Sequence, residues 1–326
     1  MLLNEITIMR IRNILSVLLL LIVSSFLCYI FLVQRTVRKT VTIPLPALRI
    51  TQQFTDPANL VKWYMPFANT TVQPDIQYND SNNIIRSGND SIEISNQSLY
   101  STRLKSFSGN KEKYFLFSAI PDTTGQEQAV VTMAYKTSLF KQWFNKGVLE
   151  KNALQSFTNF KEYLEDAKRL YGYEIKLATV TDTLFLFASE TVAVNEKRDA
   201  TRKLFEQLIA YAEKRNAGYN GVRIFYSLKN RDEKVTLFAS IGITKRIDIS
   251  PTDPFEQKMM PAGKNLLEAI YQGPFGESDK VFQALEYFKT DHNFSSMAIP
   301  FKKFLSDGYD FTDDQIVQLK VYYPIF

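Results

Sequence analysis

A run of uncharged apolar residues near the N-terminus constrains this chain more than any other stretch. It extends from Ile14 to Val33, and none of its twenty residues carries a formal charge. A helix rises about 1.5 Å per residue, so a run of this length crosses the roughly 30 Å hydrocarbon core of a bilayer. The sequence therefore predicts a short N-terminal tail at 1–13, a transmembrane helix at 14–33 and a long water-facing part, in a single-pass membrane protein.

Two other interpretations of this run are weaker. A cleaved signal peptide has a shorter apolar core and small residues at its cleavage site, and the segment FLVQRTVRKT at the end of the run has no such pattern. A lipoprotein would use Cys28, but Ser25-Phe26-Leu27 before it are not the small residues expected there. Basic residues flank the run on both sides, so the positive-inside rule leaves open which side of the membrane carries the soluble part.

The composition limits the chemistry of the water-facing part. With 326 residues, 13% of them aromatic, the chain is long enough for two soluble domains with substantial cores. Its one cysteine is Cys28 and its one histidine is His292, so neither a disulfide nor a Cys/His metal site is expected. A net charge of +5 spread along the chain, without a P-loop or a G-x-G-x-x-G motif after a strand, predicts no nucleic-acid partner, no metal and no cofactor.

Residues 40–171 combine short strand-like segments with helical patterns. Ile50–Phe54 fits a strand, and Asp56 then fits the N-cap of a short helix with Pro57 at its first position. Segments that alternate apolar and polar residues follow between residues 76 and 136 and predict antiparallel strands. Lys151–Tyr171 carries apolar residues three or four positions apart, which predicts one long amphipathic helix.

This order of elements resembles the helix-grip domains of the START/polyketide-cyclase superfamily. The similarity is carried by FTDPANLVKWYMPF at 54–67 and by GVLEKNALQSFTNFKEYLE at 147–165. In that family a curved antiparallel sheet wraps the long helix and leaves an apolar cavity, and the members include enzymes, lipid carriers and ligand sensors. The resemblance implies a cavity in which Trp63, Trp143 and Phe157 are candidate ligand contacts, although aromatic residues at helical spacing also fit a packed core.

Residues 173–326 contain two successive copies of one pattern. Two strands, a helix and two strands run from Tyr173 to Ile243, with the helix at Lys197–Asn216 capped by Asn195 or Asp199. The same order runs from residue 255 to residue 325, with a helix that Ser278 caps. Two such halves are expected to pair their sheets, to place both helices on one side and to open a ligand cleft between the halves.

The second copy looks like the GyrI-like domain, also called the AraC effector-binding or small-molecule-binding domain of bacterial regulators. The similarity lies in Met260-Pro261-Ala262-Gly263, in a strand with Tyr271 near its end, in Gly273-Pro274-Phe275 and in KVYYPI at 320–325. The resemblance covers about residues 173–326 and implies a small-molecule site. No helix-turn-helix accompanies this domain, and the N-terminal segment is a membrane anchor instead, which argues against a transcription activator.

Two lysines depart from the pattern of that family. Its members often have an acidic residue where this chain has Lys302, followed by an aromatic residue that matches Phe304, and often a Glu in the last strand where this chain has Lys320. A buried Glu suits cationic ligands, whereas lysines do not. Two interpretations stay open. Either a pocket for neutral or anionic ligands is lined by residues such as Lys302, Lys320, Tyr271, Phe304 and Tyr322, or the lysines are surface residues.

The sequence thus predicts an α+β chain with a single transmembrane helix, a helix-grip domain at 40–171 and a duplicated GyrI-like domain at 173–326. The favoured function is capture or sensing of a hydrophobic or amphipathic small molecule by a membrane-anchored binding protein. The alternative is a hydrolase or cyclase with a hydrophobic substrate, in which Glu268, Glu277, Glu286 or a tyrosine would supply the acid or base. No residue is assigned a catalytic role, and a purely structural module is the third possibility.

Overall fold

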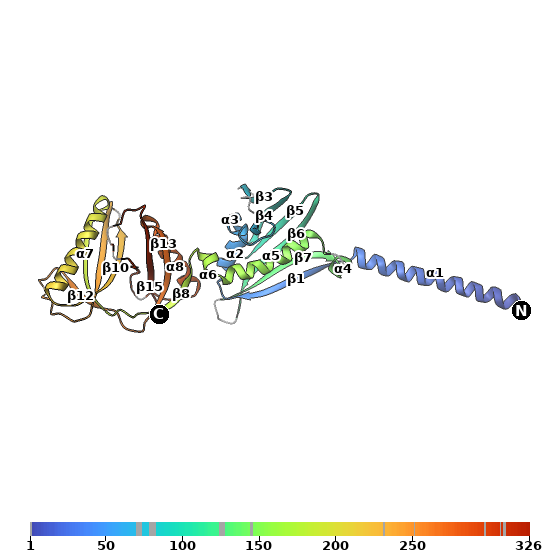
Figure 1. The fold of residues 1–326 in the computed structure, drawn as a ribbon. Helices are drawn as coiled ribbons and strands as arrows, with labels where there is room; N and C mark the ends of the chain where they lie inside the picture. Colours follow the sequence, from blue (N-terminus) through green and yellow to red (C-terminus); the bar gives the residue numbers. More distant parts are fainter. Residues whose placement is uncertain are drawn as a thin grey trace. The chain divides into compact units, whose positions relative to one another are not determined.

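The computed structural model describes residues 2–69, 74–77, 83–123, 128–143, 146–230, 232–250, 252–296, 298–306, 308 and 311–326, with side chains from residue 15 onward. The chain divides into two compact units, Met1–Glu165 and Asp166–Phe326 (Figure 1). Each unit is built on one antiparallel sheet. The predicted α+β class with an N-terminal apolar helix is confirmed.

The N-terminal apolar run is helical. Helix α1 spans Leu2–Leu32, and its segment Leu15–Leu32 is long and apolar enough to cross a membrane. This segment is almost wholly exposed, whereas the core helix of a soluble protein would be covered by its neighbours. Since a continuous exposed apolar surface marks a membrane or partner contact, α1 is a candidate membrane span, although a signal sequence passes the same test.

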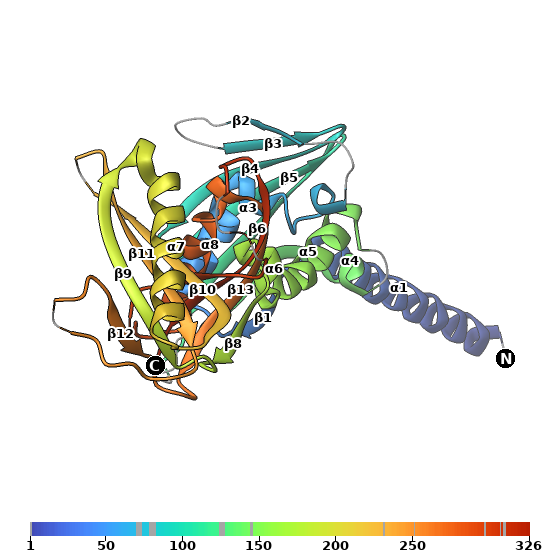
Figure 2. The same cartoon turned by 60° about the vertical axis from the view of Figure 1, so that its left-hand side comes forward.

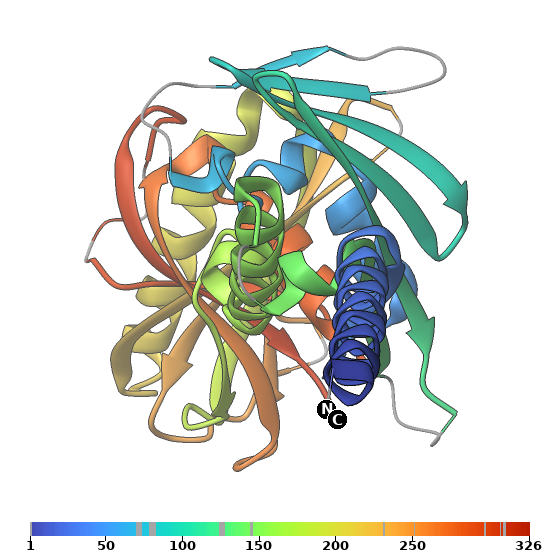
Figure 3. The ribbon, with the colours of Figure 1, turned by 90° about the vertical axis from the view of Figure 1, so that its right-hand side faces the viewer.

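Unit 1 is organised by a seven-stranded sheet with a long helix on one face (Figure 3). The strand order is β1-β7-β6-β5-β4-β3-β2. The strands are β1 (Gln34–Ile43), β2 (Asp75–Gln77), β3 (Asn83–Ser87), β4 (Asp90–Ser98), β5 (Ser101–Ser108), β6 (Lys111–Pro121) and β7 (Ala129–Ser138). Helix α5 (Val148–Glu165) packs against β1, β5 and β6. Strand β1 follows α1 almost directly and pairs along its whole length with β7.

Aromatic side chains fill the space between α5 and this sheet. Trp63 is fully buried, with its ring centroid 4.3 Å from that of Phe160 and 5.7 Å from that of Phe117. Its indole nitrogen donates a hydrogen bond of 3.0 Å to the carbonyl oxygen of Gln53, so its polar atom is satisfied. These closely packed side chains hold α5 against the sheet.

Two of the predicted elements in unit 1 differ from the structure. Residues 50–54 are not a strand but part of helix α2 (Ala47–Thr55), because Ile50 and Phe54 lie four positions apart and both reach the core. Asp56 caps α3 (Pro57–Leu60) as predicted, since its carboxylate accepts the amide of Ala58 at 2.9 Å. The predicted single helix at 151–171 is instead α5 followed by the separate helix α6 (Ala167–Tyr171).

Unit 2 contains the predicted duplication. Its first half is β8 (Ile175–Thr179), β9 (Leu184–Ala193), α7 (Lys197–Lys214), β10 (Tyr219–Lys229) and β11 (Lys234–Ile243). Its second half is β12 (Glu256–Met259), β13 (Asn265–Pro274), α8 (Lys280–Asp291), β14 (Phe301–Phe304) and β15 (Ile316–Pro324). Helix α7 lies along β9, β10 and β11 (Figure 2). Helix α8 packs on β13 and β15.

The two halves exchange their first strands. The sheet order is β12-β9-β11-β10-β14-β15-β13-β8, so β12 pairs with β9 of the first half and β8 pairs with β13 of the second. At the centre the halves meet through β10 and β14, which share the pairs Ile224↔Lys303 and Phe225↔Lys302. This exchange joins the halves at both outer strands as well as at the centre, so neither half is a complete sheet alone.

The helix caps predicted for this unit are wrong. Helix α7 begins after Glu196 and α8 after Asp279, and neither residue makes a side-chain cap. Short 3-10 turns, Val194–Glu196 and Phe275–Glu277, lead into the two helices instead. The hydroxyl of Ser278 donates to the carbonyl oxygen of Phe275 at 2.6 Å and therefore supports that turn rather than the helix.

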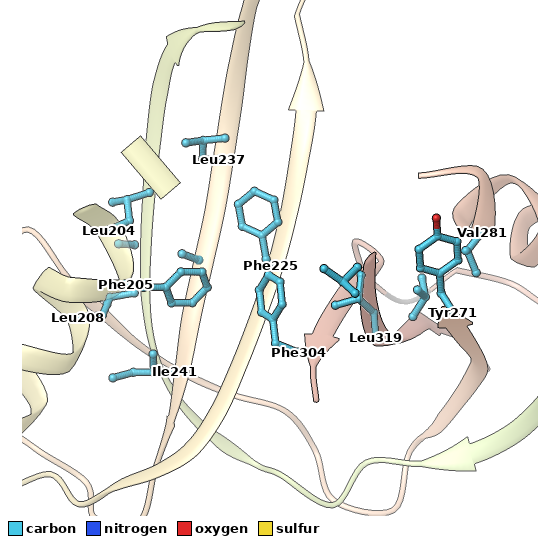
Figure 4. Close-up of a cluster of buried hydrophobic side chains, with 14 of the residues drawn as sticks. Leu204, Phe205, Leu208, Phe225, Leu237, Ile241, Tyr271, Val281, Phe304 and Leu319 are labelled. Atoms are coloured by element: carbon cyan, nitrogen blue, oxygen red, sulfur yellow. The ribbon is translucent and has the colours of Figure 1, made fainter. Parts of the chain in front are cut away.

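One apolar layer joins both helices of unit 2 to the same face of the sheet. Figure 4 shows Leu204 and Phe205 of α7 beside Phe225 of β10, with Phe304, Leu319, Tyr271 and Val281 continuing the layer toward α8. The expectation that both helices cover one side is therefore confirmed. The opposite face of the sheet carries no helix of the described chain, and its side chains are available for another role.

Candidate functional site

The uncovered face of the sheet in unit 2 holds an apolar pocket of about 420 Å³. Its wall includes Phe185, Ile224, Leu266 and Phe301, which belong to a small buried cluster separate from the layer under the helices. Strands of both halves and the segment around Met260 contribute to the lining. The pocket thus has the concave, largely apolar character of small-molecule sites.

Strand alternation explains why these side chains lie on this face. Along β13, Leu267, Ala269 and Tyr271 belong to the layer under the helices. Successive side chains of a strand point to opposite faces, so Leu266 and Glu268 point to the other side. The register Glu268↔Tyr322 places Tyr322 of β15 beside that carboxylate on the same face.

Glu268 is the polar centre of this face. Its side chain is 5% exposed, and its Oε2 accepts hydrogen bonds from the Tyr322 hydroxyl at 2.7 Å and from Lys320 Nζ at 3.1 Å. Lys176 Nζ lies 3.4 Å from Oε1. Burial alone would raise the pKa of Glu268, but the hydrogen bonds from Tyr322 and Lys320 outweigh it and hold that pKa below its usual range. The carboxylate is therefore ionised near neutral pH.

The same cluster orders Tyr322 next to the pocket. Burial and then the hydrogen bond to the Glu268 carboxylate raise the pKa of the Tyr322 phenol, so it remains a neutral donor. Its ring lies 5.2 Å, centroid to centroid, from the ring of Phe301, which lines the pocket. A rigid tyrosine thus connects the ionised carboxylate with the apolar wall.

The charged residues in the pocket wall are lysines. Lys258 and Lys264 line it, and no carboxylate is among its described lining residues. Lys258 Nζ lies 3.3 Å from the centroid of the Phe187 ring and pairs with the exposed Glu256. Because Glu268 is already matched by two lysines, its carboxylate offers no unmatched negative charge to a cationic ligand.

The structure splits the residues predicted for this domain between the two faces of the sheet. Lys320 and Tyr322 belong to the Glu268 cluster on the pocket face. Phe304 and Tyr271 belong to the layer under the helices, and the Tyr271 hydroxyl donates to the carbonyl oxygen of Pro274 at 2.6 Å. These two aromatic residues are core, so they do not meet the lysine and tyrosine of the pocket face.

Lys302 is neither on the surface nor in this pocket. Only 2% of it is exposed, and its Nζ donates to Ser278 Oγ at 2.7 Å and to Asp279 Oδ1 at 2.6 Å. Burial lowers the pKa of Lys302, while the charge of Asp279 acts in the opposite direction. It lies on the helix face because it pairs with Phe225, and the surface interpretation is wrong for this residue. Lys320 is half-buried and bound to Glu268.

The three aromatic candidates of unit 1 have different environments. Trp63 is a fully buried core residue, and Phe157 is half-buried with its ring centroid 6.4 Å from that of Phe117. Trp143 lies in helix α4 (Leu139–Trp143) and is 62% exposed. These positions do not bring the three side chains around one ligand-sized space, and Trp143 is free to contact something outside the unit.

Sequence reasoning missed most of the pocket wall. The missed residues include Phe185, Phe187, Ile224, Phe238, Leu266 and Phe301. A signal was present in LFLF at 184–187, because four consecutive apolar residues in an antiparallel strand predict that both faces of the strand are covered or lined. In the described part of the chain, no group of three or more His, Cys, Asp or Glu residues is arranged to hold a metal ion.

Comparisons with known proteins give similarity of fold at low identity. Neither a protein-family model nor a curated protein matches this sequence. The C-terminal domain of EcmrR is 13% identical, over 47% of this chain and 98% of that one, with a TM-score of 0.37. The Zhui aromatase/cyclase from Streptomyces sp. R1128 is 12% identical, over 42% of this chain and 96% of that one, with a TM-score of 0.32.

A third solved structure, Aha1 from Colwellia psychrerythraea, is 15% identical, over 41% of this chain and 95% of that one, with a TM-score of 0.29. At these identities and TM-scores, the similarities carry no argument about a ligand or an activity. The architecture described above rests on the strand order and register of this chain.

Proposed function

We propose that this chain is a membrane-anchored protein that captures or senses a hydrophobic or amphipathic small molecule in the pocket of unit 2. The single observation that carries the proposal is the apolar pocket on the uncovered face of the sheet, beside the Glu268 cluster. An apolar wall supplies affinity by burying ligand surface, and a small number of fixed polar groups orient the ligand.

The charges around the pocket favour a ligand whose polar end is neutral or anionic. Lys264 lines the pocket, and within the described part of the chain it has no acidic partner within 4.0 Å. A cationic end would meet lysines on the wall and a carboxylate already matched by Lys176 and Lys320. Repulsion between like charges then lowers its affinity relative to an isosteric alcohol or acid.

Membrane anchoring is part of this proposal. Helix α1 supports it, because the segment Leu15–Leu32 is long, apolar and almost uncovered. An apolar ligand concentrates in the bilayer, so a tether would hold the pocket near its source.

The alternative, a hydrolase or cyclase, needs a positioned proton donor or a base with a pKa near the working pH. Glu268 has neither property, because its pKa is lowered and its oxygens are occupied by Tyr322 and two lysines. The arrangement therefore favours binding over acid–base catalysis.

A matched ligand series tests the binding proposal. The full chain in lipid nanodiscs is heated with a straight-chain acid, alcohol or amine of equal length, and the melting temperature is recorded. We expect the acid and the alcohol to raise it and the amine to raise it least, because only ligands that bind the folded state stabilise it.

A variant and its control locate the effect. Ser240 is buried and lines the pocket, so Ser240→Leu fills part of the cavity and should abolish the shift. Ser189 is exposed on β9 outside the pocket, so Ser189→Leu should leave the shift unchanged. Absence of a shift with a broad panel of apolar ligands, or an equal shift in both variants, would contradict the proposal.

A further inference from the structure

The sheet of unit 1 opens between two of its strands. Strands β6 and β7 pair from Pro121↔Ala129 only as far as Leu116↔Ala134. Beyond that point β6 stays paired with β5 as far as Lys111, and β7 stays paired with β1 as far as Ser138. The two strands therefore continue without pairing to each other, and a cavity of about 820 Å³ lies there, lined from both sides and by the start of α5.

The lining of this cavity is strongly basic. We call it the basic seam, and its cationic residues are Arg103, Lys111, Lys113, Lys136 and Lys141. The two carboxylates in the lining already have cationic partners. Glu150 accepts a hydrogen bond from Lys113, and Glu112 Oε2 lies 3.0 Å from Lys105 Nζ. Within the described part of the chain, the other four cations of the seam have no acidic partner within 4.0 Å.

Glu150 fixes the floor of the seam. It is 2% exposed and binds Lys113, the Thr137 hydroxyl at 2.7 Å and the amide of Gly147 at 3.0 Å. Burial would raise the pKa of Glu150, but these hydrogen bonds outweigh it and hold that pKa below its usual range. The network joins β6, β7 and α5 across the opening, so the seam is a built feature with a fixed shape.

The basic seam lies at the end of the unit where α1 arrives. Gln34 and Thr36 line it, and Gln34 follows the last residue of α1 by two positions, which limits their separation to about 7 Å. Lys141 of the lining belongs to α4, whose Phe140 ring stacks on Phe31 of α1 with centroids 4.4 Å apart. The seam therefore sits within a few residues of the candidate membrane span.

Aromatic residues mark the same level of the unit. Tyr29 near the end of α1 accepts a hydrogen bond of 2.6 Å from Arg35, and Trp143 projects from α4 with 62% exposure. Tryptophan and tyrosine gather at the boundary between lipid and water, where lysine and arginine meet lipid phosphates. With α1 spanning a bilayer, as proposed above, these residues would place the basic seam at the depth of the lipid headgroups.

We propose that the basic seam binds the phosphate-bearing headgroup of an anionic lipid from the bilayer that α1 enters. This inference rests on the membrane anchoring in the proposed function, but it concerns a different unit and a different ligand. Unmatched cations supply the attraction, and the open strands supply a recess of fixed shape. The same contact would hold Trp143 at the interface.

Lipid retention tests the proposal. The full chain is placed in nanodiscs of phosphatidylcholine mixed with phosphatidylglycerol, then released into detergent, and the lipids that stay bound are identified by native mass spectrometry. We expect phosphatidylglycerol to be enriched on the wild-type chain. The double variant Lys111→Glu/Lys136→Glu should lower that enrichment about tenfold or more, because each basic residue near an anionic headgroup contributes substantially to binding.

The control carries the same charge change elsewhere. Lys203→Glu/Lys214→Glu alters two exposed lysines of α7 in unit 2 and should keep the wild-type enrichment. Equal enrichment in the seam variant and the wild type would overturn the proposal. Displacement of phosphatidylglycerol by millimolar inorganic phosphate, with equal stabilisation by phosphate alone, would assign the seam to a free anion and would also overturn it.

Membrane anchoring and lipid binding at the seam can be tested separately. Release of the wild-type chain from vesicles by alkaline carbonate would contradict the anchoring and this inference together. Loss of lipid enrichment with intact membrane retention would contradict only the seam. The melting-temperature shift with the ligand series of unit 2 should be the same in the wild type and the seam variant, so the two proposals can fail independently.

Discussion

Lys302 is a cation buried on the helix face of the sheet in unit 2. Its Nζ lies 5.2 Å and 5.4 Å from the ring centroids of Phe275 and Phe282, and it binds Asp279, whose side chain is 57% exposed. The pair is thus unequal: the lysine side chain is almost fully buried, whereas more than half of the aspartate side chain is exposed. Removing one partner should therefore differ greatly in cost from removing the other.

We expect Asp279→Asn to destabilise the protein by about 2–3 kcal/mol, because it leaves the buried charge of Lys302 poorly compensated. Lys302→Met should stay within about 1 kcal/mol of the wild type, since a methionine fills similar volume and Asp279 can be hydrated. Denaturant unfolding of the purified chain measures both values. Asp199→Asn, at an exposed position on α7, is the control and should change little; a larger loss for Lys302→Met than for Asp279→Asn would contradict this account.

At the scale of elements, the break between α5 and α6 depends on Asp166. Its carboxylate accepts the amides of Lys168 at 2.9 Å and Arg169 at 3.2 Å, and it has an extended backbone, with φ −95° and ψ 103°. Gly172, with φ 85°, ends α6 in the left-handed conformation that glycine adopts without strain. The short helix is thus defined by a cap at each end.

Asp166→Ala should lower the free energy of unfolding by about 1 kcal/mol, since two amides of α6 lose their acceptor. Asp166→Asn should keep most of the stability, because an amide oxygen can still cap a helix. Thermal unfolding of the two variants beside the wild type measures the difference. If alanine and asparagine cost the same, the side chain of Asp166 would not be acting as a cap.

Most of the fold could be predicted from residue patterns within single helices and strands. The duplicated order in unit 2 follows from periodicity and turn residues: α7 starts at the predicted Lys197, and β11 ends at the predicted Ile243. The prediction of one helix at 151–171 was wrong, although the apolar spacing continues through Asp166. The side chain of Asp166 caps a new helix there and so interrupts the periodic pattern. The prediction of a strand at Ile50–Phe54 was wrong because five residues can fit either a strand or one turn of helix.

The site was harder to predict than the fold. Lys302 and Lys320 occur in similar strand contexts, yet the pairs Phe225↔Lys302 and Ile270↔Lys320 place them on opposite faces of the sheet. Register depends on pairing between distant strands, and a shift of one residue exchanges the faces. The basic seam forms where β6 and β7 stop pairing with each other, and no residue pattern within either strand predicts that point. Such features come from tertiary contacts, so the sequence alone does not contain a local signal for them.

At the scale of the whole molecule, each unit has a core of its own. Both buried clusters of unit 2 and the residues packed on them lie between Ala167 and Ile325, within Asp166–Phe326. The sequence predicts the start of this domain at residue 173, whereas the compact unit starts at Asp166 and includes α6. Fragments that start at residue 166 and at residue 173 should therefore differ in their free energy of unfolding.

We expect a fragment of residues 166–326 to fold cooperatively and to be more stable than a fragment of residues 173–326 by about 3 kcal/mol. The shorter fragment loses the packing of Ala167 and Tyr171 on the core of unit 2, where the Tyr171 and Phe288 ring centroids lie 5.3 Å apart. It also loses the hydrogen bond of 2.9 Å from the Tyr171 hydroxyl to Asp291. A hydrogen bond to a charged group is worth about 1.5–3 kcal/mol, and an aromatic pair contributes about 0.5–1.5 kcal/mol more.

Urea unfolding of both fragments, followed by circular dichroism, measures this difference. Tyr171→Phe in the longer fragment is the matched intermediate, because it removes only the hydrogen bond to Asp291 and keeps the ring on Phe288. Its stability should fall between those of the two fragments. Equal stability of all three would mean that α6 contributes nothing to unit 2 and that the limit at residue 173 describes the folding unit better.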